Sequence, residues 1–423
     1  MRRLFTVLLF LLLASPAHAG VTVSTSTTQA GEAADVTIDA SFASTPDGVV
    51  LELPAGLVGN PNAAAKCSQA AFEALGCLPN AQVGTATALG FVPGAIYNLQ
   101  PSPGEPARLG ISILGLIKNQ AVVSLRPDGG LTSTIPRLNT GGLPLTSLRL
   151  TLDRDFMALP TSCGTHAVTL NGERGAFTTT GCASVPFNPS VAASLQTRQR
   201  AVPSGATVTL SLPARNAHVK RAAIVLPEGT TLSPGVANGL AGCSQAQFAG
   251  AGCPAAAQVG TVKFDTPLLG VLDGRVYFGD GFRLYVVVEG PGVQVKLAGD
   301  VQLNPATGQI TTVFDNLPQV PFTTFALTFN GGAKAVLNNP PTCGPKTLAA
   351  TLTPWSGSAV RRATASFTID RGCALPAFAP GLKVAAASTA AGRPAGAVTM
   401  EITRPDGAED LSSVTADLPP GLA

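Results

Sequence analysis

Cysteine is the residue type whose number and spacing carry the most specific chemistry in this sequence. An even number of cysteines is typical of a disulfide framework in an exported protein. Metal binding would instead need Cys and His at short spacing, yet no CxxC motif occurs, and only His166 and His218 follow the N-terminal segment. The sequence therefore favours structural disulfides and predicts neither a metal site nor a cofactor. The eight cysteines are Cys67, Cys77, Cys163, Cys182, Cys243, Cys253, Cys343 and Cys373.

Disulfides need an oxidising compartment, and the N-terminus predicts export. The basic pair Arg2-Arg3 precedes an apolar run over residues 4–14, and Ala17-His18-Ala19 offers a small-residue cleavage site. The apolar run is too short to span a bilayer, and no later run reaches the roughly 18 residues that a membrane anchor needs. We expect residues 1–19 to be a signal peptide. The mature chain is expected to be secreted, in the extracellular space or cell envelope, without a transmembrane segment.

Two cysteine segments show that the chain contains an internal repeat. Residues 67–77 read CSQAAFEALGC and residues 243–253 read CSQAQFAGAGC, and AQVGT follows both. The phrase TSCG at Cys163 returns as PTCG at Cys343. The period of about 180 residues is that of a whole domain and far exceeds the short repeats of a solenoid.

Each of these segments has room for at most two helical turns. A regular helix would hold cysteines ten residues apart at about 15 Å, whereas a disulfide needs roughly 7 Å or less between Cα atoms. Gly76 and Gly252 supply a break that brings the second cysteine back towards the first. Symmetry between the copies favours local pairing, although spacing leaves cross-pairing within a copy open. The expected disulfides are Cys67–Cys77, Cys163–Cys182, Cys243–Cys253 and Cys343–Cys373.

Short alternating runs of Val, Leu, Thr and Ala, broken by 46 Gly and 35 Pro, predict strands and turns throughout. No amphipathic helix of twelve or more residues is convincing. Chains of this kind close into sandwiches or partly closed barrels, so we expect an all-β fold of tandem β-sandwich modules, immunoglobulin-like or jelly-roll-like. The predicted division is a signal peptide at 1–19, a first β module at 20–186, a second β module at 187–373, and a partial third repeat of three strands at 374–423.

The partial third repeat is a third copy of the strand phrase that opens each module. Three strands are too few to bury a core of their own, so this copy must rest on the second module or be marginally ordered. This copy ends with Pro419-Pro420-Gly421-Leu422, at the point where a cysteine segment follows in the first two copies. This suggests a truncated array.

Several functions have little support in the sequence. Without Arg2 and Arg3 the chain has 25 basic and 24 acidic residues, and such a balance argues against a nucleic-acid partner. The nucleophile, phosphate-loop and zinc-protease motifs are absent. We expect His166 and His218 to be surface or turn residues, which leaves no base for a Ser-His or Cys-His nucleophile.

Carboxylates and one tryptophan remain as candidate site residues. Paired carboxylates serve glycosidases, but each candidate lies beside turn residues, so a solvated turn or rim is the favoured interpretation. The same holds for a calcium loop. Trp355 is the single candidate stacking platform, and packing in the core or at a module junction is favoured for it. The carboxylate candidates are Asp153 with Asp155, Asp265 with Asp273, Asp280 with Glu289, and, for calcium, Asp406, Glu409 and Asp410.

From about Val219 to Leu422 the chain resembles a family of large secreted bacterial repeat proteins of uncharacterised function. The phrases that carry the resemblance are LPEG at 226–229, NGLAGC at 238–243, QVGT at 258–261, VVVE at 286–289, PATGQ at 305–309, TLTPWSG at 351–357 and SFTID at 366–370. The first module is a degenerate version that lacks a counterpart of Trp355. The resemblance implies a surface or extracellular array and carries over no catalytic residue.

The sequence thus favours a secreted, non-enzymatic structural and interaction protein, with other envelope or extracellular proteins as partners. The alternative is an extracellular glycan- or lipid-binding β-sandwich with a cleft between its faces. A secreted hydrolase with paired carboxylates is the least favoured hypothesis. A binding module predicts an apolar pocket of several hundred Å³, on the order of known ligand sites, at matching positions of both repeats.

Overall fold

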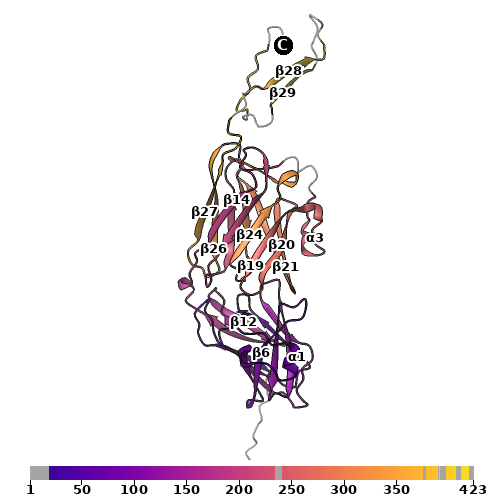
Figure 1. Ribbon diagram of the computed structural model, residues 1–423, viewed down its shortest axis with the longest axis vertical. Helices are drawn as coiled ribbons and strands as arrows, with labels where there is room; N and C mark the ends of the chain where they lie inside the picture. The colour runs from indigo at the N-terminus through magenta and orange to yellow at the C-terminus, as the bar shows by residue number, and fades with distance from the viewer. Residues whose placement is uncertain are drawn as a thin grey trace, which may run out of the picture.

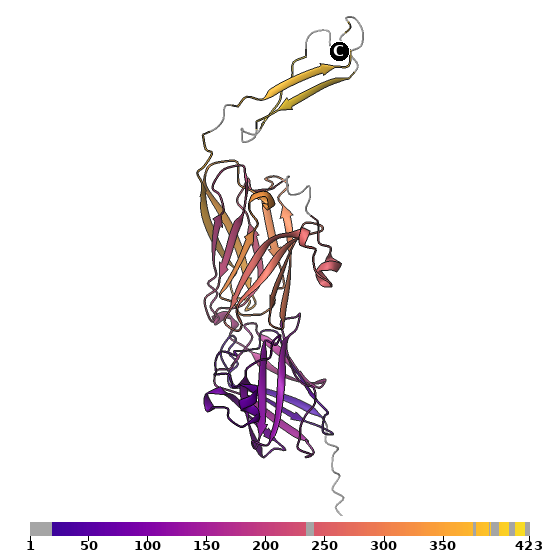
Figure 2. The ribbon, with the colours of Figure 1, turned by 45° about the vertical axis from the view of Figure 1, so that its right-hand side comes forward.

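The computed structural model describes residues 19–233, 241–374, 378–388, 390, 397–405 and 411–418. The expected signal peptide lies outside these residues, apart from Ala19. Two β modules stack end to end in an elongated molecule, and a separate hairpin follows at the C-terminal end (Figures 1 and 2). The fold is all-β, as the sequence predicts.

Module one is built on an 11-stranded antiparallel sheet in the order β1-β2-β10-β5-β6-β7-β8-β9-β3-β12-β13. Its strands are β1 (Gly20–Thr25), β2 (Val36–Ser41), β3 (Val49–Leu53), β5 (Gln82–Ala88), β6 (Val92–Leu99), β7 (Ala107–Ile113), β8 (Ile117–Leu125), β9 (Leu131–Ile135), β10 (Ser147–Leu152), β12 (Gly164–Leu170) and β13 (Glu173–Thr179). A small ribbon pairs β4 (Val58–Gly59) with β11 (Met157–Ala158).

Module two repeats this topology in the order β14-β16-β24-β19-β20-β21-β22-β23-β17-β26-β27. Its strands are β14 (Ser190–Leu195), β16 (Ala206–Ser211), β17 (Val219–Val225), β19 (Gln258–Thr266), β20 (Gly270–Gly279), β21 (Arg283–Gly290), β22 (Val293–Leu303), β23 (Ile310–Phe314), β24 (Thr324–Phe329), β26 (Gly344–Pro354) and β27 (Arg361–Ile369). Its small sheet joins β15 (Pro203–Ser204), β25 (Leu337–Asn338) and β18 (Thr231–Leu232).

Each large sheet rolls up until its two edges meet. In module one the backbone N–H of Thr180 donates to Thr28 O (2.7 Å), and that of Ala30 donates to Thr180 O (2.9 Å). In module two the N–H of Arg200 donates to Arg371 O (3.0 Å) at the matching place. Because side chains alternate across a strand, every second residue points inward, and the two halves of the roll face each other as a sandwich.

The cysteine segments form the short helices that the sequence predicts, α1 (Gln69–Glu73) and α3 (Gln245–Ala249). Ser68 Oγ accepts from the N–H of Ala71 at the start of α1, and Ser244 forms a full capping box with Gln247 in α3. The break after α1 differs from the prediction. Leu75 rather than Gly76 takes the left-handed conformation there (φ 59°), whereas Gly252 does so in module two (φ 100°).

Residues Val293–Leu303 form one continuous strand, β22, despite Gly299 within it. The strands β12 and β26 have a weak sequence signal. Both begin at the Gly of a Cys-Gly pair, and their first inward side chains are polar, His166 in β12 and Lys346 in β26, which weakens the apolar signal.

Only two of the three strands expected in the tail form among the described residues: β28 (Gly381–Ala386) and β29 (Val398–Thr403). Residues 411–418 contain no strand. The reason lies in the modules, where the third strand of the phrase, β3, pairs with β9 and β12 rather than with β1 or β2. The tail provides neither partner. Its hairpin therefore leaves Leu382 and Val384 exposed on one face.

Candidate functional site

The eight cysteines lie together as the four expected local pairs. The Cα atoms of Cys67 and Cys77 are 5.4 Å apart and those of Cys243 and Cys253 are 5.2 Å apart, across loops of equal length. The pairs Cys163–Cys182 and Cys343–Cys373 have Cα distances of 5.7 and 5.9 Å. These bonds fix the helical segment and the β12 or β26 segment of each module, a structural role.

The two histidines occupy packed positions. His166 shares a hydrogen bond with Thr179 Oγ1 (2.7 Å) and lies against Phe177, and burial lowers its pKa. Thr179 is only 1% exposed, so its hydroxyl is out of reach of a substrate.

The expectation that both histidines are surface or turn residues is wrong for His218. This residue is buried where the modules meet, and its backbone N–H donates to Thr161 Oγ1 (3.2 Å). Burial alone lowers the pKa of its imidazole to about 4. Its Nδ1 has no hydrogen-bond partner among the described residues. The ring therefore stays neutral and serves as junction packing.

The carboxylate candidates do not gather in a cleft. Asp280 lies in the turn before β21 and Glu289 near its far end, so the two are separated by most of a strand. Asp265 accepts a hydrogen bond from Thr323 Oγ1 (2.9 Å). Asp273 faces Glu289 across β20 and β21, a pairing that the sequence did not suggest, but both are exposed on the outer surface.

The remaining carboxylate pair, Asp153 with Asp155, flanks Arg154 in the sequence. Asp153 Oδ1 lies 3.7 Å from Arg154 Nε, and burial raises the pKa of Asp153 despite this arginine. Asp155 follows in a left-handed turn (φ 57°). The calcium candidates Asp406, Glu409 and Asp410 lie outside the described residues. Across the part of the chain that the structure describes, no three His, Cys, Asp or Glu side chains form a group that could hold a metal.

Trp355 packs at the module junction rather than standing free as a platform. Its Nε1–H donates to Leu317 O (2.8 Å), and Lys220 Nζ lies 5.0 Å from the ring centroid. Its backbone N–H donates to His218 O. The tryptophan thus anchors the loop 315–323 through Leu317.

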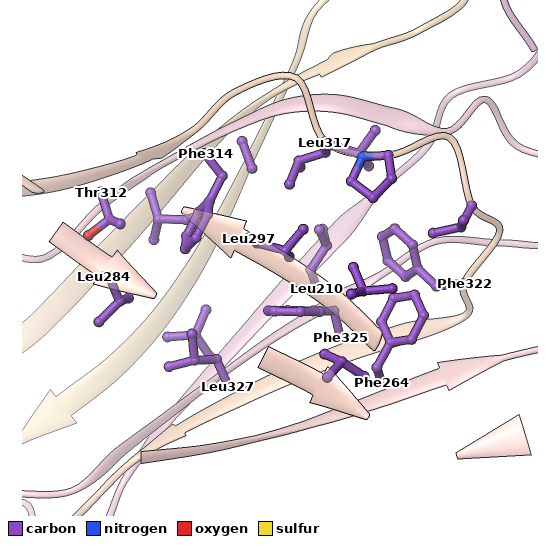
Figure 3. A pocket seen from close by; sticks show the side chains of 18 of the residues that line it. Leu210, Phe264, Leu284, Leu297, Thr312, Phe314, Leu317, Phe322, Phe325 and Leu327 are labelled. Atoms are coloured by element: carbon purple, nitrogen blue, oxygen red, sulfur yellow. The ribbon is translucent and has the colours of Figure 1, made fainter. Parts of the chain in front are cut away.

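A site that sequence reasoning did not locate is a cavity inside module two. Its volume is about 130 Å³, and it lies between the two facing halves of the rolled sheet (Figure 3). Of its lining side chains, Thr312 alone carries a polar group. The others are Val208, Leu210, Val219, Ala222, Ile224, Leu226, Phe264, Leu284, Val288, Val295, Leu297, Phe314, Leu317, Pro318, Val320, Phe322, Phe325, Leu327 and Phe329.

Aromatic rings form part of the wall of this space. Phe264 packs against Phe322 and Phe325 with ring centroids 5.6 and 6.2 Å apart, and Phe264 and Phe322 lie at one end of the cavity (Figure 3). A well-packed core normally leaves few voids larger than a water molecule. Here Val208 and Ile224 point into the space and stay only half-buried, although both lie on inner faces.

Module one has a pocket at matching positions, but it is smaller, at about 50 Å³. Strand register makes Ala88 the counterpart of Phe264, and Asn119 that of Leu297. Asn119 Nδ2 donates to Asn139 O (2.9 Å), and its Oδ1 accepts from the N–H of Asn139 (2.7 Å). The buried Asn119 thus puts a polar side chain in the wall of the module-one pocket, while the lining of the module-two cavity is almost entirely apolar.

Comparison with known proteins assigns neither a family nor an activity. No family model matches the chain, and no curated protein matches it at a significant level. Among solved structures, it is similar to a chain named BspA_C_WT (8% identity, TM-score 0.22, covering 82% of this chain and all of that one). It is also similar to the C-terminal domain of the Streptococcus pyogenes antigen I/II-family protein AspA (10%, 0.20, 84% and 100%).

A third similar structure is the type II cohesin dyad from the adaptor ScaA scaffoldin of Acetivibrio cellulolyticus (9% identity, TM-score 0.19, covering 83% of this chain and 98% of that one). Identities near 10% and TM-scores near 0.2 are too low to carry any functional argument. No helix among the described residues has the length and apolarity needed to cross a membrane.

Proposed function

We propose that the protein is a secreted, non-enzymatic structural and interaction protein of the extracellular space or cell envelope. The observation that carries the proposal is the junction between two modules of the same topology. Ala30, Cys182 and Val185 of module one form one buried apolar cluster with Leu212 and Ala217 of module two. A shared core of this kind makes two modules one stiff unit.

Polar contacts add to this junction. The side-chain amide of Gln319 in module two lies within hydrogen-bonding distance of Ser162 Oγ in module one. Asn62 Nδ2 in module one donates to Pro267 O in module two (2.8 Å). Because Gln319 is buried, its contact with Ser162 fixes an orientation as well as a contact, since leaving such a group unpaired costs about 1–3 kcal/mol. A stiff, disulfide-linked rod is suited to holding other molecules at a set distance.

Small-angle scattering of the chain from Gly20 onward tests this role. We expect the pair-distance distribution of an elongated particle in which the two modules keep one fixed arrangement. A distribution that requires freely reorienting modules would contradict a rigid rod. A screen with glycoside and ester substrates should give no turnover above the blank, and reproducible turnover would overturn the non-enzymatic role.

The cavity of module two favours a second candidate function, binding of a small apolar molecule. An engineered cavity of about 150 Å³ lined by apolar side chains stays dry and binds benzene or xenon. The 130 Å³ here is close to that size, but it is below the roughly 300–1,000 Å³ of sites for drug-sized ligands. A single ring or a short alkyl chain fits, whereas a glycan or a whole lipid does not.

Benzene provides the test of this second function. It should raise the melting temperature of the wild-type chain, since a ligand at 100 times its Kd adds about 2.7 kcal/mol to the stability of the state it binds. The matching position of module one holds Val49. Ala222→Val introduces the same residue into the cavity wall of module two and should reduce the increase in melting temperature that benzene causes. An equal shift in both proteins would place benzene elsewhere and remove the cavity from consideration.

A further inference from the structure

Module two meets module one through four loops at one end of its rolled sheet: 212–218, 267–269, 290–293 and 315–323. Each contacts module one. His218 bonds to Thr161, Pro267 accepts from Asn62, and Gln319 lies against Ser162. A Cβ added to Gly292 would lie 2.7 Å from Pro106 Cδ, so this turn is also in close contact.

The matching loops of module one are 42–48, 89–91, 114–116 and 136–146, because the strand order of the two modules is the same. They lie at the opposite end of module one from the junction and contact no other module. Four large apolar side chains are exposed on them: Phe91 (78%), Leu114 (60%), Leu116 (80%) and Leu143 (50%). We call these four residues the tip. All four lie on loops at the same end of the sheet, which makes this end a candidate interaction surface.

The far end of module two carries the counterparts of the surface that module one offers to the junction. Its turn 280–282 corresponds to 100–106 and its turn 304–309 to 126–130, again by strand order. Phe282 is 52% exposed there. A Cβ on Gly308 would meet nothing within 4 Å, whereas one on Gly129 in module one would lie 3.1 Å from Pro318. We call these two turns the receiving end. The tail hairpin extends beyond this end of module two along the long axis (Figures 1 and 2).

We propose that the tip of one molecule docks onto the receiving end of a second copy, head to tail, in the geometry of the junction inside each chain. The proposal rests on the structural role above and names its partner. The internal junction already seats the corresponding loops of module two on the corresponding end of module one, which is the argument for a second copy as the occupant. Such an interface joins two different surfaces and therefore builds open chains rather than closed dimers.

Two single substitutions and their mixture test this arrangement. Leu116→Asp places a charge on the tip, and Phe282→Asp places one on the receiving end. Residue 282 has φ 59°, which Asp tolerates better than Phe. Sedimentation velocity over a wide concentration series should show association of the wild type. Each variant alone should associate at least tenfold more weakly, since losing one good apolar anchor costs more than about 1.4 kcal/mol.

The equimolar mixture gives the decisive result. The tip of the Phe282→Asp chain and the receiving end of the Leu116→Asp chain are both intact, so the mixture should form one-to-one dimers and nothing longer. Val50→Asp, at an exposed position of β3 on the side of the sheet, should associate like the wild type. Unchanged melting temperatures show that the variants fold.

Other outcomes overturn the proposal. A wild-type chain that stays monomeric across the series rules out docking but leaves the rod itself, measured by scattering, unaffected. Association of Phe282→Asp with wild-type strength would mean that two tips meet each other. A mixture that stays monomeric would show that the two surfaces are not complementary.

Discussion

The side-chain amide nitrogen of Gln319 in module two lies 3.1 Å from Ser162 Oγ in module one, so this contact crosses the boundary between the two modules. Gln319 is only 6% exposed. It belongs to the loop 315–323, which also supplies Leu317, Pro318, Val320 and Phe322 to the wall of the cavity. The contact between modules and the shape of the interior therefore depend on the same loop.

Ser162→Ala should lower the free energy of unfolding by about 1–3 kcal/mol, because it leaves a buried amide without its partner. Adding Gln319→Met, which removes the amide but keeps the length of the side chain, should recover most of this loss. Chemical denaturation of the single and double variants measures both steps. Ser124→Ala, at an exposed hydroxyl, is the control and should stay within about 0.5 kcal/mol. A double variant less stable than Ser162→Ala would show that the amide acts through other contacts.

Stability should depend on pH through His218. The imidazole has an ordinary pKa of 6.5 when unfolded and about 4 when folded, so between these values the unfolded state binds more protons. The free energy of unfolding therefore rises as pH increases from about 4 to 6.5 and then levels off. The expected loss at pH 5 relative to pH 8 is about 2 kcal/mol.

His218→Phe isolates this contribution, because every other titrating group, including His166, is common to both proteins. The difference in stability between the variant and the wild type should change by about 2 kcal/mol from pH 8 to pH 5, in favour of the variant at low pH. Denaturation at several pH values gives this difference directly. A pH-independent difference would mean that His218 is solvated in the folded state.

The two disulfides of module two should differ in their contribution to stability. The Cys243–Cys253 bond closes ten residues and the Cys343–Cys373 bond closes thirty. The loop-entropy model gives about 2.7 and about 3.6 kcal/mol respectively. Paired Cys→Ser variants, compared by denaturation with and without reductant, measure each contribution. A larger loss for the shorter loop would show that packing around Cys243, which is fully buried, outweighs chain entropy.

The strand pattern, the repeat and the cysteine pairs could be predicted because each depends on local spacing. Val36, Ile38 and Ala40 are every second residue of β2 and point inward. The CSQA segments indicate the two short helices, whose N-caps are Ser68 and Ser244. The burial of His218 could not be predicted, because it results from a loop of module two that meets Thr161 of module one. Nothing within a few residues of His218 signals that contact.

The sequence suggests a cleft between the sheet faces as an alternative, but for a related reason it does not place the cavity in module two. Apolar side chains at inward positions indicate a core, but whether they fill it depends on residues from seven strands and one loop at once. A comparison of the two repeats could have given a warning. Inner positions that hold Ala88, Leu145 and Leu148 in module one hold Phe264, Phe322 and Phe325 in module two. Rings and smaller aliphatic side chains cannot pack the same space equally well.

Exchanging Val and Ile at matching positions of the two repeats adds one methylene group to module two or removes one from module one. The two substitutions test whether the cavity is empty in solution. Val208 faces Leu327 in module two as Ile38 faces Leu150 in module one, and Ile38 is only 1% exposed. Val208→Ile extends the side chain into free space and should stabilise the protein by about 0.8 kcal/mol. The reverse change, Ile38→Val, removes a methylene from a filled core and should cost about 0.5–1.5 kcal/mol.

The signs of the two changes, measured by chemical denaturation, separate the alternatives. A stabilising Val208→Ile together with a destabilising Ile38→Val requires free volume beside Val208 but not beside Ile38. If Val208→Ile instead destabilises the protein, the inner faces close together in solution and the added group has to force them apart. That result would also predict no effect of benzene, so the exchange and the ligand experiment check each other.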